Sequence, residues 1–232
     1  MDFSGKHVVV TGGTGALGTA VVGALVAAGA ACTVPYVHDA EAQRFPYNDQ
    51  KRVTLVSVTD LADETEVAKV YANIRTSPLW ASIHIAGGFA AGKIIETDKT
   101  ALMAQIDSNL VSCFLCCRAA VKAMQGGGRI VNVAARPALE WRSGAGMTAY
   151  TIAKTGVAAL TAALAEEVAK DDILVNAVAP SIVDTGANRK AMPKANFDAW
   201  PKVEEVAATI VFLASTENRV TRGAIVPVYG KS

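Results

Sequence analysis

Apolar and polar positions along the chain form two alternating kinds of segment. Short continuous runs of apolar and β-branched residues indicate strands that are buried on both faces. Between them lie longer stretches in which apolar residues recur every three or four positions, as in helices. The predicted strands are residues 7–11, 31–37, 53–58, 81–86, 128–134, 173–179 and 224–228. The predicted helices are residues 16–28, 63–75, 98–124 with a break near Asp107, 148–170 and 202–215.

This alternation of strand and helix predicts the fold class. Strands connected through helices run parallel, so we expect an α/β fold, a doubly wound (Rossmann) parallel sheet of about seven strands with helices on both faces. A chain of 232 residues suits one hydrophobic core, and we expect a single domain over residues 1–232. The long stretch without clear periodicity, residues 184–201, is expected to be a substrate lid, because such segments in compact domains are usually functional.

Composition and charge exclude several classes of partner. The formal net charge is +1 with scattered basic residues, so the basic stripe of a nucleic-acid-binding protein is missing and we expect no nucleic acid. No run of about 18 apolar residues occurs, which argues against a membrane partner. Asp2 stands where a signal peptide needs positive charge. We therefore expect a cytoplasmic protein that acts on a small-molecule substrate.

The cysteines and histidines show no spacing typical of a metal site. Three of the four cysteines fall in one predicted helix, and no second group of Cys or His completes a ligand set. The histidines lie far apart in the sequence. We expect buried free thiols and no metal; the residues concerned are Cys32, Cys113, Cys116, Cys117, His7, His38 and His84.

A glycine-rich turn, Thr-Gly-Gly-Thr-Gly-Ala-Leu-Gly at residues 11–18, connects the first predicted strand to the first predicted helix. Gly13, Gly15 and Gly18 satisfy G-x-G-x-x-G, in which the glycines allow a tight turn, close approach of a pyrophosphate and packing of helix on strand. The N-terminus of the following helix would point its free N–H groups at that phosphate. Because the turn follows the first strand of an alternating chain, it predicts a dinucleotide site.

The end of the second predicted strand leaves the choice between NAD and NADP open. An acid about 20 residues beyond the glycines would bind the ribose 2′-hydroxyl, and an arginine would accommodate a 2′-phosphate. Tyr36 and the residue after it offer neither. His38 or Arg44 could reach a phosphate, but Asp39 and Glu41 lie beside them.

Tyr150 and Lys154 are four residues apart at the start of a long predicted helix, so they lie on one face. The unperturbed pKa of tyrosine is about 10, and a nearby ammonium favours the phenolate. Taken alone, such a pair is more often a tyrosine packed in the core and a lysine whose ammonium extends to solvent. Together with the glycine-rich turn, it predicts a proton donor with its partner.

These motifs resemble the short-chain dehydrogenase/reductase superfamily over essentially the whole chain. Residues 11–18 are similar to its T-G-x-x-x-G-x-G, with Ala16 for the middle glycine, and Asn132-Val133 and residues 176–180 follow in the expected order. The resemblance implies three catalytic residues: Tyr150 as proton donor, Lys154 as the partner that lowers its pKa and holds the ribose, and Asn109, which holds Lys154 through a water. It also implies that the following residues bind the cofactor: Gly12, Thr14, Gly15, Leu17, Gly18, Tyr36, Asp60, Leu61, Ala86, Gly87, Gly88, Tyr150, Lys154, Pro180, Val183 and Thr185.

Two departures from the family pattern affect the predicted chemistry. Residues 84–88, His-Ile-Ala-Gly-Gly, replace the usual Asn-Asn-Ala-Gly. Ala135 stands where the family has the serine that shares the substrate carbonyl with tyrosine. One such donor is worth on the order of 3 kcal/mol, so ketone reduction should suffer unless Ser143 or Thr148 takes its place.

The dihydropteridine reductases are a branch of the superfamily with alanine at this position, and they reduce a quinonoid pterin with the same Tyr and Lys. The lid here is similar to theirs over residues 185–200, with Asn-Arg-Lys-x-Met-Pro and a Trp. We therefore expect NAD or NADP-dependent hydride transfer to a C=N or C=O substrate, including pterin-like ones. The expected substrate contacts are Ala135, Trp141, Met192 and Trp200.

Two other functions remain open from the sequence. A reductase of 3-oxoacyl or sugar-like ketones would need a relocated oxyanion donor. A non-catalytic dinucleotide sensor would typically lack the Tyr or the Lys, and this chain keeps both.

Two predicted helices are apolar on more than one side, which indicates a second covered surface. One runs from Asn109 to Met124, with Leu110, Phe114, Cys117 and Val121 at helical spacing, and the other begins near Tyr150. In the superfamily these two helices form a contact between subunits, so the resemblance implies a homodimer or homotetramer.

Overall fold

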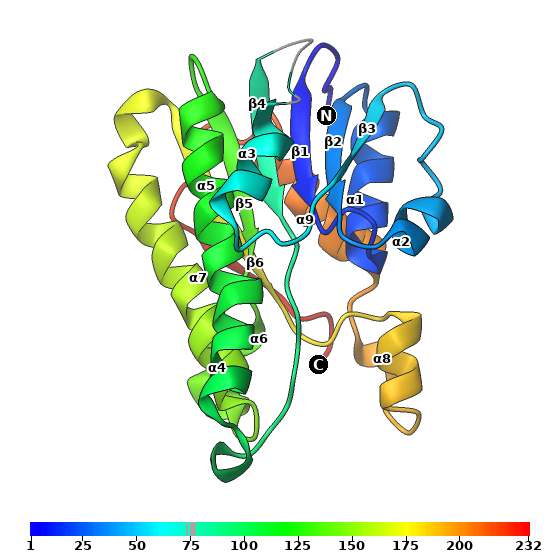
Figure 1. Cartoon of the computed structure of the whole chain (residues 1–232), viewed down its shortest axis with the longest axis vertical. Coiled ribbons are helices and arrows are strands. Elements are labelled where there is room, and N and C mark those ends of the chain that lie inside the picture. Colours follow the sequence, from blue (N-terminus) through cyan, green and yellow to red (C-terminus); the bar gives the residue numbers. More distant parts are fainter. Residues whose placement is uncertain (73, 75–77) are drawn as a thin grey trace.

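The computed structural model describes residues 1–72, 74 and 78–232, and within them seven parallel strands form one sheet in the order β3-β2-β1-β4-β5-β6-β7 (Figure 1). Every neighbouring pair is parallel. The sheet confirms the doubly wound fold class. The strands are β1 (His7–Thr11), β2 (Ala31–Tyr36), β3 (Val53–Ser57), β4 (Leu79–His84), β5 (Gly128–Val133), β6 (Ile173–Pro180) and β7 (Ile225–Val228).

Helices cover both faces of this sheet (Figure 1). Alternate residues of β1 point to opposite faces of the sheet. Val8 and Val10 pack with α1 and α9 in the core on one face. Val9 packs with α3, α5 and α7 in the core on the other face. The helices are α1 (Ala16–Ala27), α2 (Asp39–Arg44), α3 (Glu64–Ala72), α4 (Lys99–Ile106), α5 (Ser112–Ala123), α6 (Arg136–Leu139), α7 (Thr148–Glu167), α8 (Gly186–Ala191) and α9 (Val203–Ala214). Short 3-10 turns lie at Ile94–Glu96, Trp141–Gly144, Ala169–Asp171 and Phe197–Ala199.

The long predicted helices are confirmed, with ends that differ by a few residues. The helix predicted over 63–75 spans Glu64–Ala72, and residues 73 and 75 lie outside the described part of the chain. The break predicted near Asp107 is a π-helical turn, Asp107–Val111, that joins α4 to α5 without interrupting the helical path. The sequence did not predict α2, α6 and α8, because four to six residues are too short to show a helical period.

The continuous helical segment Lys99–Ala123 is long and apolar enough to cross a membrane, judged by length and composition only. Its α5 half packs against the sheet and α3 through buried residues such as Leu115 and Cys116. Buried helices that pack against a sheet meet the same criteria of length and composition, and α5 packs in this way.

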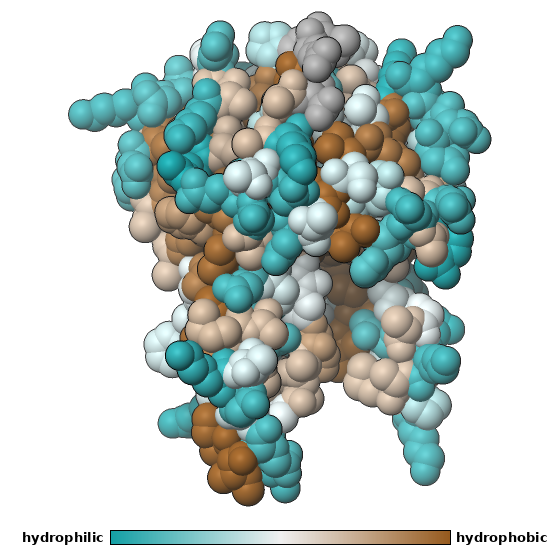
Figure 2. Space-filling model, viewed as in Figure 1, coloured by the Kyte–Doolittle hydropathy of each residue, from teal (hydrophilic) through white to brown (hydrophobic). Residues whose placement is uncertain are grey.

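The strand order reverses between β1 and β4, where the loops after the two strands separate. In doubly wound sheets, ligands bind beyond the carboxyl ends of the strands at this point. The glycine-rich turn follows β1 and residues 85–88 follow β4. Figure 2 shows the surface hollowed beyond this edge, between the lobe formed by α4 and α7 and the lobe formed by α8.

Candidate active site

The glycine-rich turn is packed so closely that three of its glycines have no room for a side chain. A Cβ on Gly12, where φ is +67°, would lie 2.7 Å from the backbone nitrogen of Ala86, and one on Gly18 would lie 2.1 Å from the Gly12 carbonyl oxygen. A Cβ on Gly13 would lie 2.6 Å from Val34 of β2. The turn is therefore clamped between β2, the loop after β4 and the start of α1.

Gly15 differs from these glycines, because the nearest atom to a Cβ placed there, the Gly12 oxygen, is 3.4 Å away. Gly15 is also the N-cap of α1, without a side-chain hydrogen bond to the helix terminus from the described residues. The first N–H groups of α1 are thus available for an anion. This open cradle fits the pyrophosphate of a dinucleotide.

The predicted adenosine contacts surround the same edge of the sheet. Tyr36 ends β2, Asp60 follows β3 and accepts a hydrogen bond from the Ala62 N–H, and Leu61 is buried. The Thr14 hydroxyl donates to Glu41 at 3.2 Å, which brings a carboxylate to the turn.

The predicted basic candidates for a 2′-phosphate are His38 and Arg44. His38 caps α2, and Arg44 donates to the carbonyl of Ala40 within the same helix.

Tyr150 and Lys154 occupy the first two turns of α7 and share one face, as predicted. The Lys154 ammonium lies 5.8 Å from the centroid of the Tyr150 ring and donates to the Val133 carbonyl at 2.8 Å. Burial lowers the pKa of Lys154 to about 8, and the charge of Cys113 opposes that shift.

The expected lowering of the Tyr150 pKa is wrong for this structure. Burial raises the pKa of Tyr150 to about 12. The Phe89 ring packs edge-on against the phenol, with centroids 5.0 Å apart, and helps to exclude water. The penalty for charging a buried phenol therefore outweighs the attraction of the ammonium.

Asn109 lies in the π-helical turn and is buried beside Lys154. Its Nδ2 donates to the Gly88 carbonyl at 2.9 Å and to the Gln105 carbonyl at 3.0 Å. Its Oδ1 is buried and has no hydrogen-bond partner among the described residues. A buried acceptor of this kind indicates a water or ligand at the site, and π-helical turns are frequent at functional sites.

A family model described as short chain dehydrogenase matches residues 6–196. The chain belongs to the short-chain dehydrogenase/reductase superfamily. Enzymes of this superfamily use NAD or NADP and act as dehydrogenases or reductases on small molecules, and this chain is such an enzyme.

The similar proteins cover nearly the whole chain. Galactitol 2-dehydrogenase of Rhizobium johnstonii is 32% identical, over 97% of this chain and 94% of its own length. A 3-oxoacyl-[acyl-carrier-protein] reductase of Pseudomonas aeruginosa is 30% identical, over 99% of this chain and 98% of its own. Among solved structures, a blue fluorescent protein from a metagenomic library in complex with NADPH is 27% identical with a TM-score of 0.88, covering 100% of this chain and 99% of its own.

The position of the missing serine is occupied by a buried side chain. Ala135 is 6% exposed and precedes α6. Neither predicted replacement donor is arranged for the role. The exposed Ser143 donates its hydroxyl to the Glu140 carbonyl at 2.7 Å, and Thr148 is an exposed residue at the start of α7.

The segment predicted to be a lid, residues 184–201, folds into α8 and a 3-10 turn, and Asp184 joins its two ends. The Asp184 carboxylate binds Arg189 through two hydrogen bonds of 2.6 and 2.8 Å and Lys202 at 2.6 Å. The two basic groups hold the pKa of Asp184 far below its usual range. At the same place the Asp184 N–H donates to the Pro201 carbonyl.

The remaining predicted residues are distributed around this segment. Pro180 ends β6, Val183 accepts a hydrogen bond from Asn188, and Thr185 caps α8 by accepting from the Asn188 N–H. Among the predicted substrate contacts, Trp141 is exposed and Met192 is half-buried directly after α8. Trp200 is buried against Phe197, so the structure gives it a packing role and does not bring it to the open surface.

Several residues of the site could not be predicted from the sequence. Phe89 packs against Tyr150 from a loop, and Asp184 connects the two ends of residues 184–201 by ion pairs. His84, in the first position of the altered family motif, hydrogen-bonds Asn132 of β5 at 2.8 Å. The contacts of Phe89 and His84 join residues that are far apart in the sequence, and the pairs of Asp184 depend on how residues 184–202 fold.

Proposed function

We propose that the chain reduces a C=N or C=O bond in a small ring compound of pterin-like type, with NADH or NADPH as the reductant. The observation that carries this proposal is the convergence of Lys154 and Asn109 on residues 87–88, beside the glycine cradle, with the Tyr150 ring next to Lys154. The nicotinamide supplies the hydride when bound. Residues 1–232 then act as one domain, with residues 184–201 as the substrate lid.

Side chains of the protein supply the proton that the substrate gains, and others stabilise Tyr150 once it has lost that proton. Tyr150 keeps its hydroxyl proton at neutral pH, because burial raises its pKa to about 12, and it donates that proton to the substrate atom that gains charge. The Lys154 ammonium, fixed by the Val133 carbonyl, stabilises the phenolate that forms. The unpartnered Asn109 Oδ1 holds a water that lies within reach of Lys154.

Ala135 and two exposed aromatic side chains favour a flat ring with a C=N bond. A ketone develops a full oxyanion, and one hydrogen-bond donor to it is worth about 3 kcal/mol. A quinonoid ring gains conjugation when it is reduced, so protonation by Tyr150 suffices. Phe89, 62% exposed, and Trp141, 70% exposed, offer the aromatic surfaces on which such a ring can stack.

The second candidate is a reductase of 3-oxoacyl or sugar-like ketones. The names of two relatives, a 3-oxoacyl-[acyl-carrier-protein] reductase and a galactitol 2-dehydrogenase, favour it. The third, a dinucleotide sensor without turnover, is disfavoured by the intact Tyr150 and Lys154 pair.

Steady-state assays with quinonoid dihydropterin and a panel of ketones separate these functions. We expect turnover of the pterin with NADH or NADPH and little turnover of the ketones. Efficient reduction of ketones alone would support the second function, and nucleotide binding without any turnover would support the sensor.

The outer faces of α5 and α7 support assembly into a homodimer or homotetramer. Phe114 of α5 is 50% exposed and Ile152 of α7 is 49% exposed, whereas Cys117, which the sequence placed on the same apolar stripe, is buried towards the sheet. A monomer mass by light scattering at micromolar concentration would contradict this proposal. The four cysteines are free and buried, which suits the reducing cytoplasm that we propose as its location.

A further inference from the structure

Three side chains that are separated in the sequence converge in the core beneath the active site. His84 is the last residue of β4, and Cys113 and Cys117 are one turn apart on the face of α5 that packs against the sheet. All three are buried, and one ligand atom from each lies within 4.8 Å of the others. The sequence spacing gave no sign of this group, because the fold alone brings His84 to the two cysteines.

A fourth atom, the Oδ1 of Asn132 on β5, lies among these three. It is 2.8 Å from His84 Nδ1, 3.3 Å from Cys113 Sγ and 3.5 Å from Cys117 Sγ. Cys117 Sγ also lies 3.5 Å from His84 Nδ1. One amide oxygen has two lone pairs, so it cannot accept well from an imidazole N–H and two thiols at once. In the protonated cluster a sulfur atom, which is a weaker acceptor, must therefore take one of these hydrogen bonds.

We propose that His84, Cys113, Cys117 and Asn132 form a binding site for a zinc ion. Zinc prefers thiolate and imidazole ligands in a tetrahedral arrangement, with Zn–S of about 2.3 Å and Zn–N of about 2.0 Å. In such a tetrahedron the ligand atoms are separated by roughly 3.3–3.8 Å. Four of the six distances between the ligand atoms are 2.8 to 3.5 Å, and the His and Cys ligand atoms all lie within 4.8 Å of one another, so small movements of the side chains accommodate the ion.

The charge balance of the cluster suits a divalent ion. Zinc would replace the two thiol protons, and two thiolates with Zn²⁺ leave the buried site neutral. A site that stays neutral avoids a new buried charge next to the Lys154 ammonium.

The surroundings hold the ligands in the required orientation. His84 Nε2 lies 2.8 Å from the Ser82 hydroxyl, a partner that leaves Nδ1 free for the ion. Asn132 Nδ2 donates to Thr161 at 2.9 Å, and this bond keeps Oδ1 directed at the cysteines. Both contacts are of the kind that fixes ligands around a metal.

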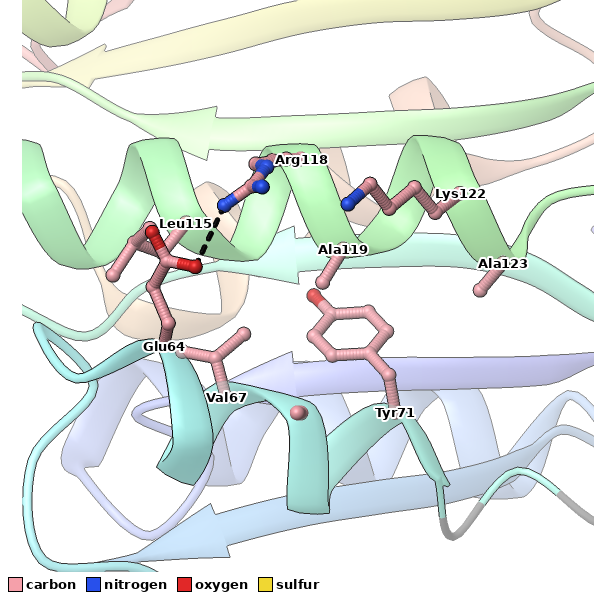
Figure 3. A pocket seen from close by; sticks show the side chains of 9 residues that line it. Glu64, Val67, Tyr71, Leu115, Arg118, Ala119, Lys122 and Ala123 are labelled. Carbon is pink, nitrogen blue, oxygen red and sulfur yellow. Dashed lines mark ion pairs between the residues drawn. The ribbon is translucent and has the colours of Figure 1, made fainter.

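The ion would reach the cluster through a pocket between α3 and α5, which Figure 3 shows with Tyr71 in its wall. It has a volume of about 320 Å³, and Tyr71 is part of its wall. The Tyr71 hydroxyl lies 3.3 Å from His84 Nε2 and 2.8 Å from Ser82, so this ring separates the pocket from the cluster. The ion would enter during folding or when Tyr71 moves, and would then fix α5 to β4 and β5.

The zinc content of the purified chain tests this proposal. Cells are grown with added zinc, the protein is purified without chelators, and metal is measured by mass spectrometry. The variants are Cys113→Ser and Cys117→Ser, with Cys116→Ser as the matched control, because Cys116 is buried on the same helix outside the cluster. We expect one zinc ion per chain in the wild type and in Cys116→Ser, and background levels in the other two variants.

Cobalt gives a second readout that does not depend on the folding of any variant. The wild-type chain is refolded with Co²⁺, and thiolate ligation produces a sulfur-to-cobalt charge-transfer band together with the intense visible bands of a tetrahedral ion. A wild-type chain with neither zinc nor these bands would overturn the proposal and leave a hydrogen-bonded thiol cluster only. Equal zinc content in Cys113→Ser and the wild type would also overturn it.

Discussion

Asn109 and Lys154 meet at Gly87. A Cβ at this glycine would lie 2.5 Å from the Oδ1 of Asn109 and 3.4 Å from the Nζ of Lys154. The absence of a side chain therefore leaves a small space in which a buried acceptor and a buried ammonium share their surroundings. This relationship connects the loop after β4, the π-helical turn and α7, and it explains why those three segments carry the proposed proton chemistry.

Nucleotide binding should distinguish two glycines of the first turn. Gly15 has an ordinary extended backbone and room for a Cβ, so Gly15→Ala should fold normally but weaken binding of NADH and NADPH by crowding the pyrophosphate. Gly18→Ala is the matched variant, and we expect it to lower stability as well, because its Cβ would collide with the Gly12 carbonyl. Fluorescence titration and urea denaturation measure the two effects. Unchanged affinity in both variants would contradict the cofactor site.

The buried charge of Lys154 should lower the free energy of unfolding at neutral pH. Its folded pKa of about 8 lies below the unfolded value, so the unfolded chain binds more protons and the wild type gains stability as the pH rises from 8 to about 10.4. Lys154→Met removes the buried charge and should raise the free energy of unfolding at pH 7 by about 1–2 kcal/mol, since the lost hydrogen bond to Val133 offsets part of the gain. At pH 10 the difference should shrink. Urea denaturation that shows the variant to be less stable at both pH values would contradict the buried ammonium.

The rate of reduction should fall at alkaline pH. The kcat/KM for the cofactor reports on the free enzyme, in which Lys154 loses its proton as the pH rises through about 8 while Tyr150, with a pKa of about 12, stays protonated. We therefore expect a decline above pH 8 that follows one ionisation. Cofactor affinity measured over the same range separates a loss of binding from a loss of proton transfer. A profile that rises through pH 8 would have the wrong sign for this account.

Ala135→Ser tests the class of substrate. If the natural substrate is pterin-like, the added hydroxyl should change that activity by no more than a few fold. Ketone reduction should improve about ten-fold or more in kcat and kcat/KM together, equivalent to about 1.4 kcal/mol, because the hydroxyl donates to the oxyanion in the transition state. Circular dichroism and cofactor affinity serve as controls. A wild-type enzyme that reduces ketones efficiently, and loses this activity in Ser143→Ala or Thr148→Val, would favour the relocated donor.

The fold could be predicted from the sequence because the patterns that indicate it lie within short stretches of the chain. Continuous apolar runs such as His7–Thr11 and Ile173–Pro180 mark strands covered on both faces, and the intervening helices are long enough to show a period. The glycine turn and the Tyr150–Lys154 pair are also local, since their residues lie within one turn or helix. These elements are present where the pattern indicated them.

The rest depends on tertiary contacts that no local pattern encodes. The direction of the Tyr150 pKa is set by burial in the folded chain, where Phe89, 61 positions earlier, packs against the ring. The cluster of His84 with Cys113 and Cys117 exists because β4 and α5 pack together. Trp200, predicted to contact the substrate, is instead buried against Phe197, and α8 is too short to show a period.

Single-turnover reduction by Tyr150→Phe tests the central claim most directly. Wild-type enzyme and the variant are each loaded with reduced nicotinamide and mixed with quinonoid dihydropterin, and the loss of nicotinamide fluorescence is followed. We expect rapid oxidation in the wild type and a rate lower by 100-fold or more in the variant, as for the loss of a general acid, with cofactor affinity unchanged. Oxidation by Tyr150→Phe at the wild-type rate would contradict Tyr150 as the proton donor.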